Sequence, residues 1–275
     1  MKKKWIYGKT VVLTGASSGI GQKLAETLIK KYNCFVIGIG RNQLKMEKTK
    51  SLLGDKQTNF TYQLFDVSNI KNWQEFYDYL VKNSIKVDVL INNAGFLLPF
   101  AKFEKYTEEN IEEIINTNFL SAVYSVKIML PMIKESPTPA IINVSSSAAL
   151  CSIVGTSMYT ASKCALKGFT ECLAQDYKKQ IYVGLVCPGF TKTSIFDRQN
   201  SDISNSKLIN SVCSSLDKAV KKITKKIVKK RKRIVVGIDA KMMDIFYRAF
   251  PRTISSTVRK VLKASKQEIF NDIFK

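Results

Sequence analysis

The sequence predicts an α/β protein in which a parallel sheet is covered by helices on both faces. Short runs rich in Val, Ile and Leu alternate with longer segments whose apolar residues recur at helical spacing. The short runs are apolar throughout, as expected for strands that are buried on both sides. Strands that alternate with helices in this way are typical of a doubly wound parallel sheet, here of about seven strands.

The predicted elements alternate regularly along the chain. Strands are expected at 11–13, 34–39, 60–65, 87–91, 140–144, 181–187 and 234–236. Helices are expected at 20–29, 42–53 and 73–81, in a long stretch that ends near 131–133, and at 159–177. The polar segment at 190–215 is rich in Ser, Asn and Asp, which predicts a mobile loop beside a site. The next helix has Leu216, Val220, Ile223 and Ile227 on its inner face, and a helical tail follows the last strand.

The composition is that of an ordinary globular protein. Its 275 residues are 45% hydrophobic and 24% charged. We expect one domain at 1–275, with a substrate loop and helix at 190–230 and a basic helical tail at 238–275. No apolar run approaches the roughly 18 to 20 residues that span a bilayer, and no secretory leader is expected. The six cysteines include no C-x-x-C pair and are predicted to be reduced, mostly buried thiols of a cytosolic protein, without a metal site.

The net charge of +22 is concentrated near the carboxyl end of the chain. Residues 218–275 contain 18 Lys and Arg but only 4 Asp and Glu. One interpretation is an electrostatic surface for anionic lipid, an acidic protein or nucleic acid, and the other is the solvated face of an ordinary helix. A nucleic-acid partner is not expected, because apolar residues interrupt the basic run at helical spacing, as in a packed helix.

A glycine-rich turn joins the first predicted strand to the first predicted helix. It runs Thr14-Gly-Ala-Ser-Ser-Gly-Ile-Gly21. Glycines allow a tight turn and a close approach of the backbone to a pyrophosphate, and the helix start supplies free N–H groups and a favourable dipole. The turn therefore predicts a dinucleotide site in a Rossmann-like fold. A glycine turn without a ligand is the alternative.

The end of the second predicted strand indicates which dinucleotide binds. Gly40 and Arg41 stand where an NAD-binding protein usually places an acidic residue for the ribose hydroxyls. An arginine at this point can pair with a 2′-phosphate, which favours NADP(H) over NAD(H). The alternative is a surface arginine that caps a loop.

Tyr159 and Lys163 form a candidate acid/base pair in a chain that contains no histidine. Because they are four residues apart on a predicted helix, the two side chains share one face. The ammonium of the lysine can then favour ionisation of the phenol and make it a usable acid or base near neutral pH. Histidine-based chemistry is excluded.

Together these motifs resemble those of the short-chain dehydrogenase/reductase family, from Lys9 to Gly237. In its tail the chain is similar to hydroxysteroid-dehydrogenase-like members. The resemblance rests on motifs in a set order, namely the glycine turn, Asp66-Val67, Asn92-Asn-Ala-Gly95, Asn118, Ser146, Tyr159 with Lys163, and Pro188-Gly189 with Thr193.

The resemblance implies a role for each matching residue. Tyr159 would exchange a proton with the carbonyl or alcohol oxygen, Ser146 would hold that oxygen, and Lys163 would hold the nicotinamide ribose. Asn118 would position a water that links Lys163 to solvent, with a helix kink as the alternative. The implied catalytic residues are Asn118, Ser146, Tyr159 and Lys163. The implied cofactor-binding residues are Gly15, Ser17, Ser18, Gly19, Ile20, Gly21, Arg41, Asp66, Val67, Asn93, Ala94, Gly95, Tyr159, Lys163, Pro188, Gly189, Thr191 and Thr193.

The implied protein is an NADP(H)-dependent enzyme that interconverts a ketone or aldehyde and an alcohol by hydride transfer. Apolar residues near the site favour a lipid-like or steroid-like substrate, although some are equally suited to the core. They are Phe96, Leu97, Leu98, Ile153, Val154, Phe190, Ile195 and Phe196. The alternatives are a 3-oxoacyl-carrier-protein-type reductase, which would usually end near the last strand, and a non-catalytic protein that senses NADP(H).

The resemblance also implies a homodimer or homotetramer, formed through the helices that carry Asn118 and Tyr159. In the tail, aromatic and aliphatic residues are interleaved with Lys and Arg. We expect this tail to border the mouth of the pocket and to contact an anionic membrane or a partner subunit. The expected location is cytoplasmic, with peripheral membrane contact.

Overall fold

The computed structural model describes residues 4–191, 193, 195 and 214–274. Its centre is a seven-stranded parallel sheet with the strand order β3-β2-β1-β4-β5-β6-β7. The strands are β1 (Thr10–Thr14), β2 (Phe35–Gly40), β3 (Phe60–Leu64), β4 (Val89–Asn92), β5 (Ala140–Val144), β6 (Tyr182–Pro188) and β7 (Arg233–Val236). The strand order reverses between β1 and β4, which is where doubly wound sheets bind ligands. The predicted fold class is confirmed.

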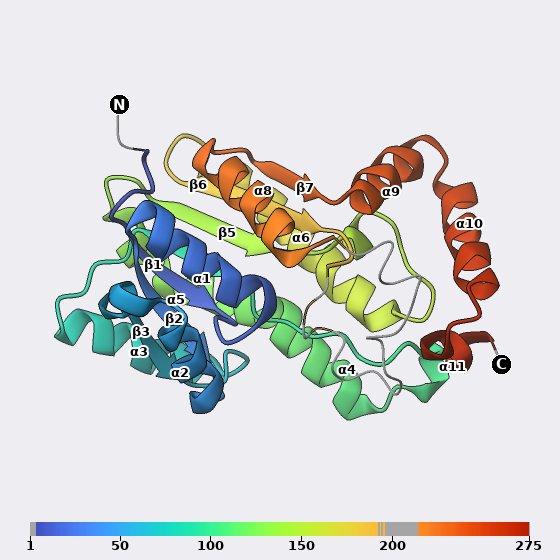
Figure 1. Ribbon diagram of the computed structural model, residues 1–275, viewed down its shortest axis with the longest axis horizontal. Helices are drawn as coiled ribbons and strands as arrows, with labels where there is room; N and C mark the ends of the chain where they lie inside the picture. The colour runs from blue at the N-terminus through green and yellow to red at the C-terminus, as the bar shows by residue number, and fades with distance from the viewer. Residues whose placement is uncertain (1–3, 192, 194, 196–213, 275) are drawn as a thin grey trace.

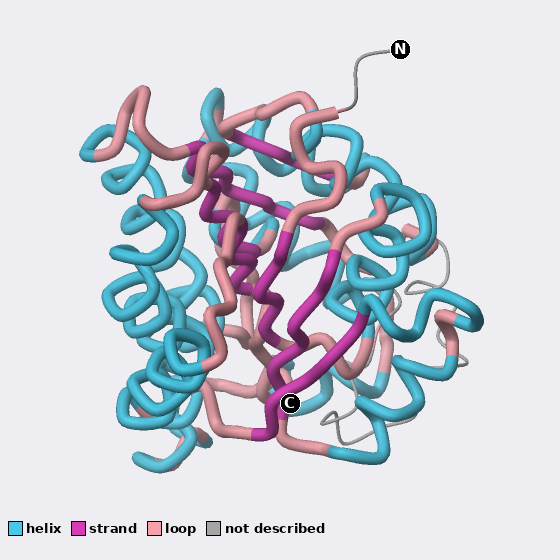
Figure 2. Tube along the Cα trace, turned by 90° about the vertical axis from the view of Figure 1, so that its left-hand side faces the viewer, coloured by secondary structure: helices cyan, strands magenta, loops and turns pink. Residues whose placement is uncertain are grey.

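Helices cover both faces of this sheet (Figure 2). One layer consists of α1 (Gly19–Tyr32), α2 (Gln43–Ser51) and α8 (Leu216–Val228). The other consists of α3 (Ile70–Lys82), α5 (Ser121–Lys134), which continues from α4 (Glu108–Ile115), and α6 (Ser157–Asp176). Short 3-10 helices lie at η1 (Gly54–Asn59), η2 (Phe103–Lys105) and η4 (Ser147–Ala149).

The central strand β1 shows why the sheet needs both layers. Val11 and Leu13 pack in one apolar cluster with residues of α1 and α8, whereas Val12 packs in another with residues of α3 and α5. Successive side chains of a strand point to opposite faces, so a strand that is covered on both sides is apolar at every position.

The helix predicted at 73–81 begins earlier than expected. α3 starts at Ile70, because the side-chain oxygen of Asn69 accepts the backbone N–H of Lys71 at 3.0 Å and caps the helix. The predicted start rested on apolar periodicity, which does not register a polar cap.

The long helical stretch expected to end near 131–133 is not one regular helix. α4 and α5 are separated by η3 (Asn116–Leu120), a π-helical turn that contains Asn118. Such turns interrupt α-helices mostly as single turns and are frequent at functional sites. Asn118 therefore lies in a π-helical turn rather than in a regular α-helix.

The helical tail packs back against the rest of the fold. α9 (Ile238–Ala249) and α10 (Pro251–Ala264) are followed by η6 (Glu268–Phe270) and α11 (Asn271–Phe274). Figure 1 shows these orange and red elements at the right, ending at α11 near the C-terminus. Phe270 and Ile273 are buried in a third cluster with Phe100, and the rings of Phe100 and Phe270 meet edge to face at 5.0 Å.

The cysteines are less uniformly buried than predicted. Cys34, Cys151 and Cys187 are buried free thiols, whereas Cys164 and Cys172 are exposed on α6. Among the described residues, no group of His, Cys, Asp or Glu is arranged to hold a metal, and no helix is long and apolar enough to cross a membrane. Most of the predicted loop at 190–215 lies outside the described residues.

Candidate active site

A cavity of about 400 Å³ lies at the carboxyl ends of the central strands. It is lined by nearly every residue that the sequence predicted for the site, drawn from six strand ends and the start of α1 and α6. The lining includes Gly15, Ser17, Ser18, Gly19, Ile20, Arg41, Asp66, Val67, Asn93, Ala94, Gly95, Ser146, Tyr159, Lys163, Pro188, Gly189, Thr191 and Thr193. Gly21 and Asn118 were also predicted for the site, but they do not line the cavity.

The glycine turn is shaped to receive a pyrophosphate. Gly15 and Gly19 have φ values of +66° and +51°, a backbone conformation that side chains disfavour. A Cβ on Gly21 would overlap the carbonyl oxygen of Gly15, so only glycine lets α1 start this close to the turn. No acidic residue occupies the first turn of α1, and no side-chain cap covers its N-terminus. The helix start can therefore bind an anion.

Thr14, which the prediction did not assign to the site, ties the glycine turn to the strand beside it. Its hydroxyl oxygen accepts the backbone N–H groups of Asn93 and Ala94, each at 2.9 Å. In return, the side-chain amide of Asn93 donates to the carbonyl oxygen of Thr14 at 3.0 Å. These bonds hold the ends of β1 and β4 together at the cavity floor. The position of Thr14 within the glycine motif was the feature of the sequence that could have assigned it to the site.

A buried chain of polar side chains lies beneath the cavity. Asn92 donates to Asn143 at 2.9 Å and accepts from Ser125 at 2.7 Å, and Asn143 donates to Thr170 at 2.9 Å. All four side chains are buried, and they link β4, β5, α5 and α6. Fully satisfied buried networks fix one arrangement of their elements. Asn143, a polar residue inside an apolar strand, was the signal that sequence reasoning missed.

Asn118 is held from the π turn against the residue after Gly95. Its side chain accepts the backbone N–H of Phe96 and donates to the Phe96 carbonyl oxygen, both at 2.9 Å. It also donates to the hydroxyl of Ser162 at 3.2 Å. A Cβ on Gly95 would lie 2.9 Å from Asn118 Oδ1 and 3.1 Å from Lys163 Nζ, so the three residues meet at one point.

Tyr159 and Lys163 are both buried at the cavity wall, from one face of α6. Lys163 Nζ donates to the carbonyl oxygen of Val144 at 3.2 Å and lies 5.9 Å from the centre of the Tyr159 ring. Of the three adjacent serines, Ser145 turns away to donate to the Lys163 carbonyl oxygen at 2.8 Å. Ser146 lines the cavity together with Tyr159 and acts on the pKa of its phenol. The choice of Ser146 as the catalytic serine stays a prediction.

Burial dominates the titration of this pair. It raises the pKa of Tyr159 to about 12, and the hydrogen bond from Ser146 only partly offsets that effect. Burial also lowers the pKa of Lys163 to about 8. Lys163 is not among the causes of the Tyr159 shift, so the prediction that Lys163 favours ionisation of the phenol stays a prediction.

The lowered pKa of Lys163 predicts a pH dependence of stability. An unfolded lysine titrates near 10.4, so between about pH 8 and 10 the unfolded chain binds more protons at this position than the folded one. The contribution of Lys163 to the free energy of unfolding should therefore rise with pH over this window, before the raised pKa of Tyr159 opposes it. Urea unfolding of wild type and Lys163→Met at several pH values measures the difference. We expect the wild type to gain stability relative to the variant, and parallel curves would contradict this.

Arg41 lies at the rim of the cavity in an ion pair with Asp66. The two side chains are 3.4 Å apart and substantially exposed. Burial raises the pKa of Asp66, but hydrogen bonds from the N–H and hydroxyl of Ser68 and the charge of Arg41 outweigh it and leave the pKa below its ordinary value. Lys45, which the sequence analysis did not select, also lines this end of the cavity from α2. Two cations are therefore available to a phosphate here.

One residue of the tail supports the turn after β6 that lines the cavity, although it does not line the cavity itself. Asp239, at the start of α9, accepts the backbone N–H of Phe190 at 2.7 Å, and a Cβ on Gly189 would overlap its carboxylate. Burial raises the pKa of this carboxyl group. Asp239 thus holds the turn that follows β6. The sequence analysis missed it, because the contact joins segments about 50 residues apart.

Part of the cavity wall is apolar. Phe96, Leu97, Ile153, Phe190 and Ile195 line it, together with Phe100, which was not predicted. Leu98 is buried and Val154 is half-buried, but neither lines this cavity, which corrects their expected place. Both were expected there from their position in the sequence. In the structure, both pack in the third apolar cluster. Phe196 lies outside the described residues.

The fold and the site define a Rossmann-type dinucleotide-binding protein. The turn at the start of α1 has room only for glycine, and the N–H groups there favour a pyrophosphate. The cavity is lined both by this turn and by Tyr159. These residues fit a nicotinamide dinucleotide.

The chain belongs to the short chain dehydrogenase family, whose model matches residues 9–204. A ketoacyl reductase, HetN, from Nostoc is 28% identical over 248 residues, which are 87% of this chain and 85% of HetN. A 3-ketodihydrosphingosine reductase from Bos taurus is 32% identical over 256 residues, 86% of this chain and 74% of that protein. The protein is a short-chain dehydrogenase/reductase enzyme.

Solved structures of similar fold cover nearly the whole chain. A Burkholderia phymatum short chain dehydrogenase/reductase in complex with NAD has a TM-score of 0.75 at 22% identity, over 97% of this chain and 98% of that one. A Sphingobium yanoikuyae short-chain dehydrogenase in complex with NADPH also has a TM-score of 0.75 at 22% identity, over 94% and 97%. At this identity the likeness concerns the fold.

Proposed function

We propose that this enzyme interconverts a carbonyl compound and an alcohol at the wall formed by Ser146 and Tyr159. The single observation that carries the proposal is the convergence of Ser146, Tyr159 and Lys163 on a cavity that begins at the glycine turn. A nicotinamide cofactor would supply or accept the hydride when bound.

In the direction of reduction, the Tyr159 hydroxyl gives its proton to the carbonyl oxygen, and the carbonyl group of the substrate becomes the alcohol group of the product. In the reverse direction the same oxygen takes the proton from the alcohol. Ser146, which lines the same cavity as the phenol, holds the substrate oxygen beside it.

Lys163 and Asn118 have supporting roles in this proposal. Lys163 binds the cofactor ribose, and its charge favours the phenolate when Tyr159 gives up its proton. Asn118 holds the Phe96 backbone and lies beside Lys163 through Gly95. This position supports an indirect role, in which the π turn of Asn118 orders a proton route to Lys163.

The proposed cofactor is NADP(H) rather than NAD(H). Arg41 and Lys45 are the cations at the adenosine end of the cavity, where β2 ends without an acidic residue. A 2′-phosphate is a bidentate partner for a guanidinium. Asp66 competes for Arg41 in the protein alone, so binding NADP(H) would draw the arginine away from that pair.

Substitution of the two cations tests this preference. We expect Arg41→Ala and Lys45→Ala each to raise the KM for NADPH by about tenfold or more, because a hydrogen bond to a charged group is lost, and to leave the KM for NADH unchanged. Lys48→Ala is the matched control, since Lys48 is exposed on the same helix but does not line the cavity. An equal loss with both cofactors would refute the 2′-phosphate contact.

The proposed substrate is apolar and lipid-like. The support is the apolar wall of Leu97, Phe100, Ile153, Phe190 and Ile195. A 3-oxoacyl thioester is the second candidate, favoured by the HetN relative, which is named as a ketoacyl reductase. The tail favours the first candidate, because Phe270 of η6 packs against Phe100 of the apolar wall and adds apolar surface behind it.

A panel of ketones and alcohols, read by nicotinamide absorbance with NADPH and NADH, tests the function. Long-chain or steroid ketones are expected to be reduced with a higher kcat/KM than short polar ketones and acyl thioesters. No turnover of any carbonyl or alcohol, together with tight NADPH binding, would favour the cofactor-sensing alternative.

The enzyme is also proposed to act as a homodimer or homotetramer built from single domains of residues 1–275. The support is a row of small exposed residues on α6, which would let a second helix approach closely, namely Ala161, Cys164, Gly168 and Cys172. Sedimentation equilibrium decides the assembly, and a monomer at every concentration would contradict it.

A further inference from the structure

The outward face of α9 is apolar, although it lies in the most basic part of the chain. Ile238, Met242, Ile245 and Phe246 are between 43% and 76% exposed, and their spacing places them on one side of the helix. Phe250, which is 60% exposed, continues this face at the turn into α10. We refer to these five residues as the α9 face. On the opposite side, Ala240 and Met243 are buried against the body of the protein.

The acidic residues of α9 are turned away from this face. Asp244 forms a bidentate pair with Arg233 at 2.6 and 2.7 Å and a further pair with Arg248 at 3.1 Å. Asp239 accepts the N–H of Phe190 in the interior. The α9 face therefore presents apolar side chains without a negative charge from its own helix.

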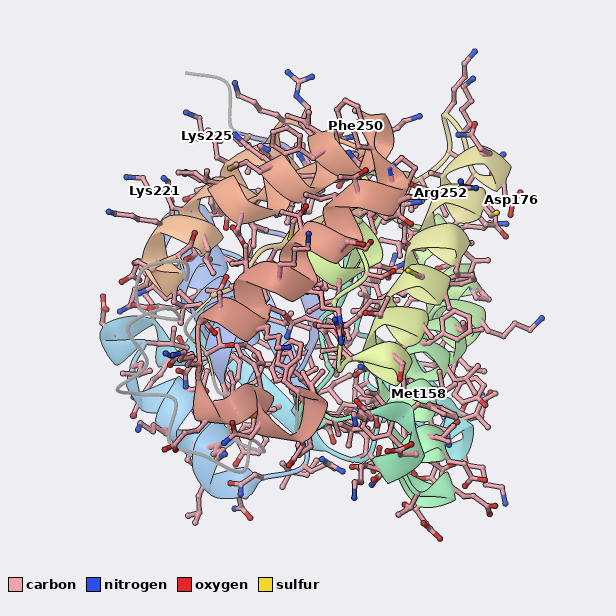
Figure 3. All side chains as sticks on the ribbon, turned by 90° about the vertical axis from the view of Figure 1, so that its right-hand side faces the viewer. Met158, Asp176, Lys221, Lys225, Phe250 and Arg252 are labelled. Atoms are coloured by element: carbon pink, nitrogen blue, oxygen red, sulfur yellow. The ribbon has the colours of Figure 1, made fainter. Side chains whose placement is uncertain are left out.

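Cations surround the α9 face. Lys241 and Arg248 are exposed on α9 itself, and the charge of Lys241, after burial, contributes to the lowered pKa of Lys226 on α8. Figure 3 shows the arrangement: Phe250 lies between the lysines of α8, labelled Lys221 and Lys225, and Arg252 at the start of α10. Apolar residues at the centre and flexible cations around them are the pattern of helices that lie in a membrane interface.

We propose that the α9 face docks this enzyme on the surface of an anionic lipid bilayer. Charge complementarity selects this occupant, because residues 218–275 carry 18 Lys and Arg against 4 Asp and Glu. A second copy of the chain is a poor occupant, since two such faces would bring their cations together. The apolar side chains would enter the boundary between headgroups and acyl chains while the lysines contact the anionic headgroups.

Docking through α9 places the substrate side of the cavity next to the bilayer. The inner side of the same helix holds Phe190 through Asp239, and Met243 and Tyr247 pack in the cluster that contains Tyr159. A lipid-like substrate could then pass to the cavity over a short distance. This last step rests on the proposed function, whereas the docking itself does not.

The test is co-sedimentation of the full-length chain with vesicles, without cofactor or substrate. We expect binding at low ionic strength to phosphatidylcholine vesicles that contain about one-third phosphatidylglycerol, little binding to phosphatidylcholine alone, and release by salt. Ile245→Asp with Phe246→Asp should weaken binding by at least about tenfold, because two side chains can no longer be buried in the interface. Leu44→Asp is the matched control and should bind as wild type, since Leu44 is 82% exposed on α2, outside the α9 face.

A spectroscopic arm reports insertion directly. The native tryptophans are part-buried Trp5 and buried Trp73, so Phe246→Trp adds a solvent-exposed reporter. Its emission should shift to the blue with anionic vesicles and stay unchanged with neutral ones. The proposal is overturned if wild type and the double variant bind vesicles equally, if neither binds, or if the double variant instead dissociates a dimer seen by sedimentation velocity. Equal binding to polyglutamate, with the same dependence on Ile245 and Phe246, would identify an acidic protein as the partner and also overturn it.

Discussion

Tyr159→Phe is expected to lower kcat by about 10²- to 10⁴-fold, the usual contribution of a positioned acid or base. The substitution removes one oxygen from a side chain that is buried at the cavity wall, and the ring and its packing remain. No histidine is available to take over the proton. The loss should appear in kcat, because the proton transfer is needed only in the transition state. Initial rates with the best substrate of the panel measure it.

The control for this experiment separates chemistry from folding. Tyr79→Phe removes the hydroxyl of a tyrosine that is 41% exposed on α3, away from the cavity, and should keep wild-type activity. Tyr159→Phe should keep its melting temperature within a few degrees and should still bind NADPH. Full activity in Tyr159→Phe would refute the assignment of the acid/base group.

Gly21→Ala is expected to weaken NADPH binding by more than about tenfold, a cost of about 1.4 kcal/mol or more. The new Cβ would overlap the carbonyl oxygen of Gly15 and would also lie 2.6 Å from the side-chain amide of Asn93. Backbone atoms cannot swing aside as a flexible side chain can, so α1 must move away from the turn. The N–H groups at its start would then no longer meet the pyrophosphate. Fluorescence titration with NADPH measures the affinity.

Gly168→Ala is the matched substitution for this test. Gly168 lies in α6, and a Cβ there would meet no atom within 4 Å. The NADPH affinity of this variant should not change, because Gly168 does not line the cavity. If Gly21→Ala binds NADPH as tightly as Gly168→Ala does, the close approach of α1 to the turn is not required for the cofactor.

Local patterns in the sequence determined the order of the elements and most of the site. The strands of the sheet are apolar at successive positions because both faces are covered, and this is visible in a run such as Val11 to Leu13. The glycine turn and the four-residue spacing of Tyr159 and Lys163 are equally local, since backbone geometry alone places their groups. The carboxyl ends of parallel strands then bring the remaining motifs to one edge.

Only the tertiary structure decided how these groups behave once they meet. The pKa values of Tyr159 and Lys163 depend on how deeply α6 is buried, which no spacing encodes. The π turn of Asn118 and the contact of Asp239 with Phe190 likewise depend on packing between distant segments.

The tail is the clearest case of this division. The sequence alone established that its residues are basic and amphipathic, because charge and apolar spacing are written in order along the chain. Two contacts decided which side of α9 faces inward. Asp244 pairs with Arg233, which requires β7, and Met243 packs in the third apolar cluster. An apolar face can be assigned to solvent or to a partner only after the core has selected the opposite one.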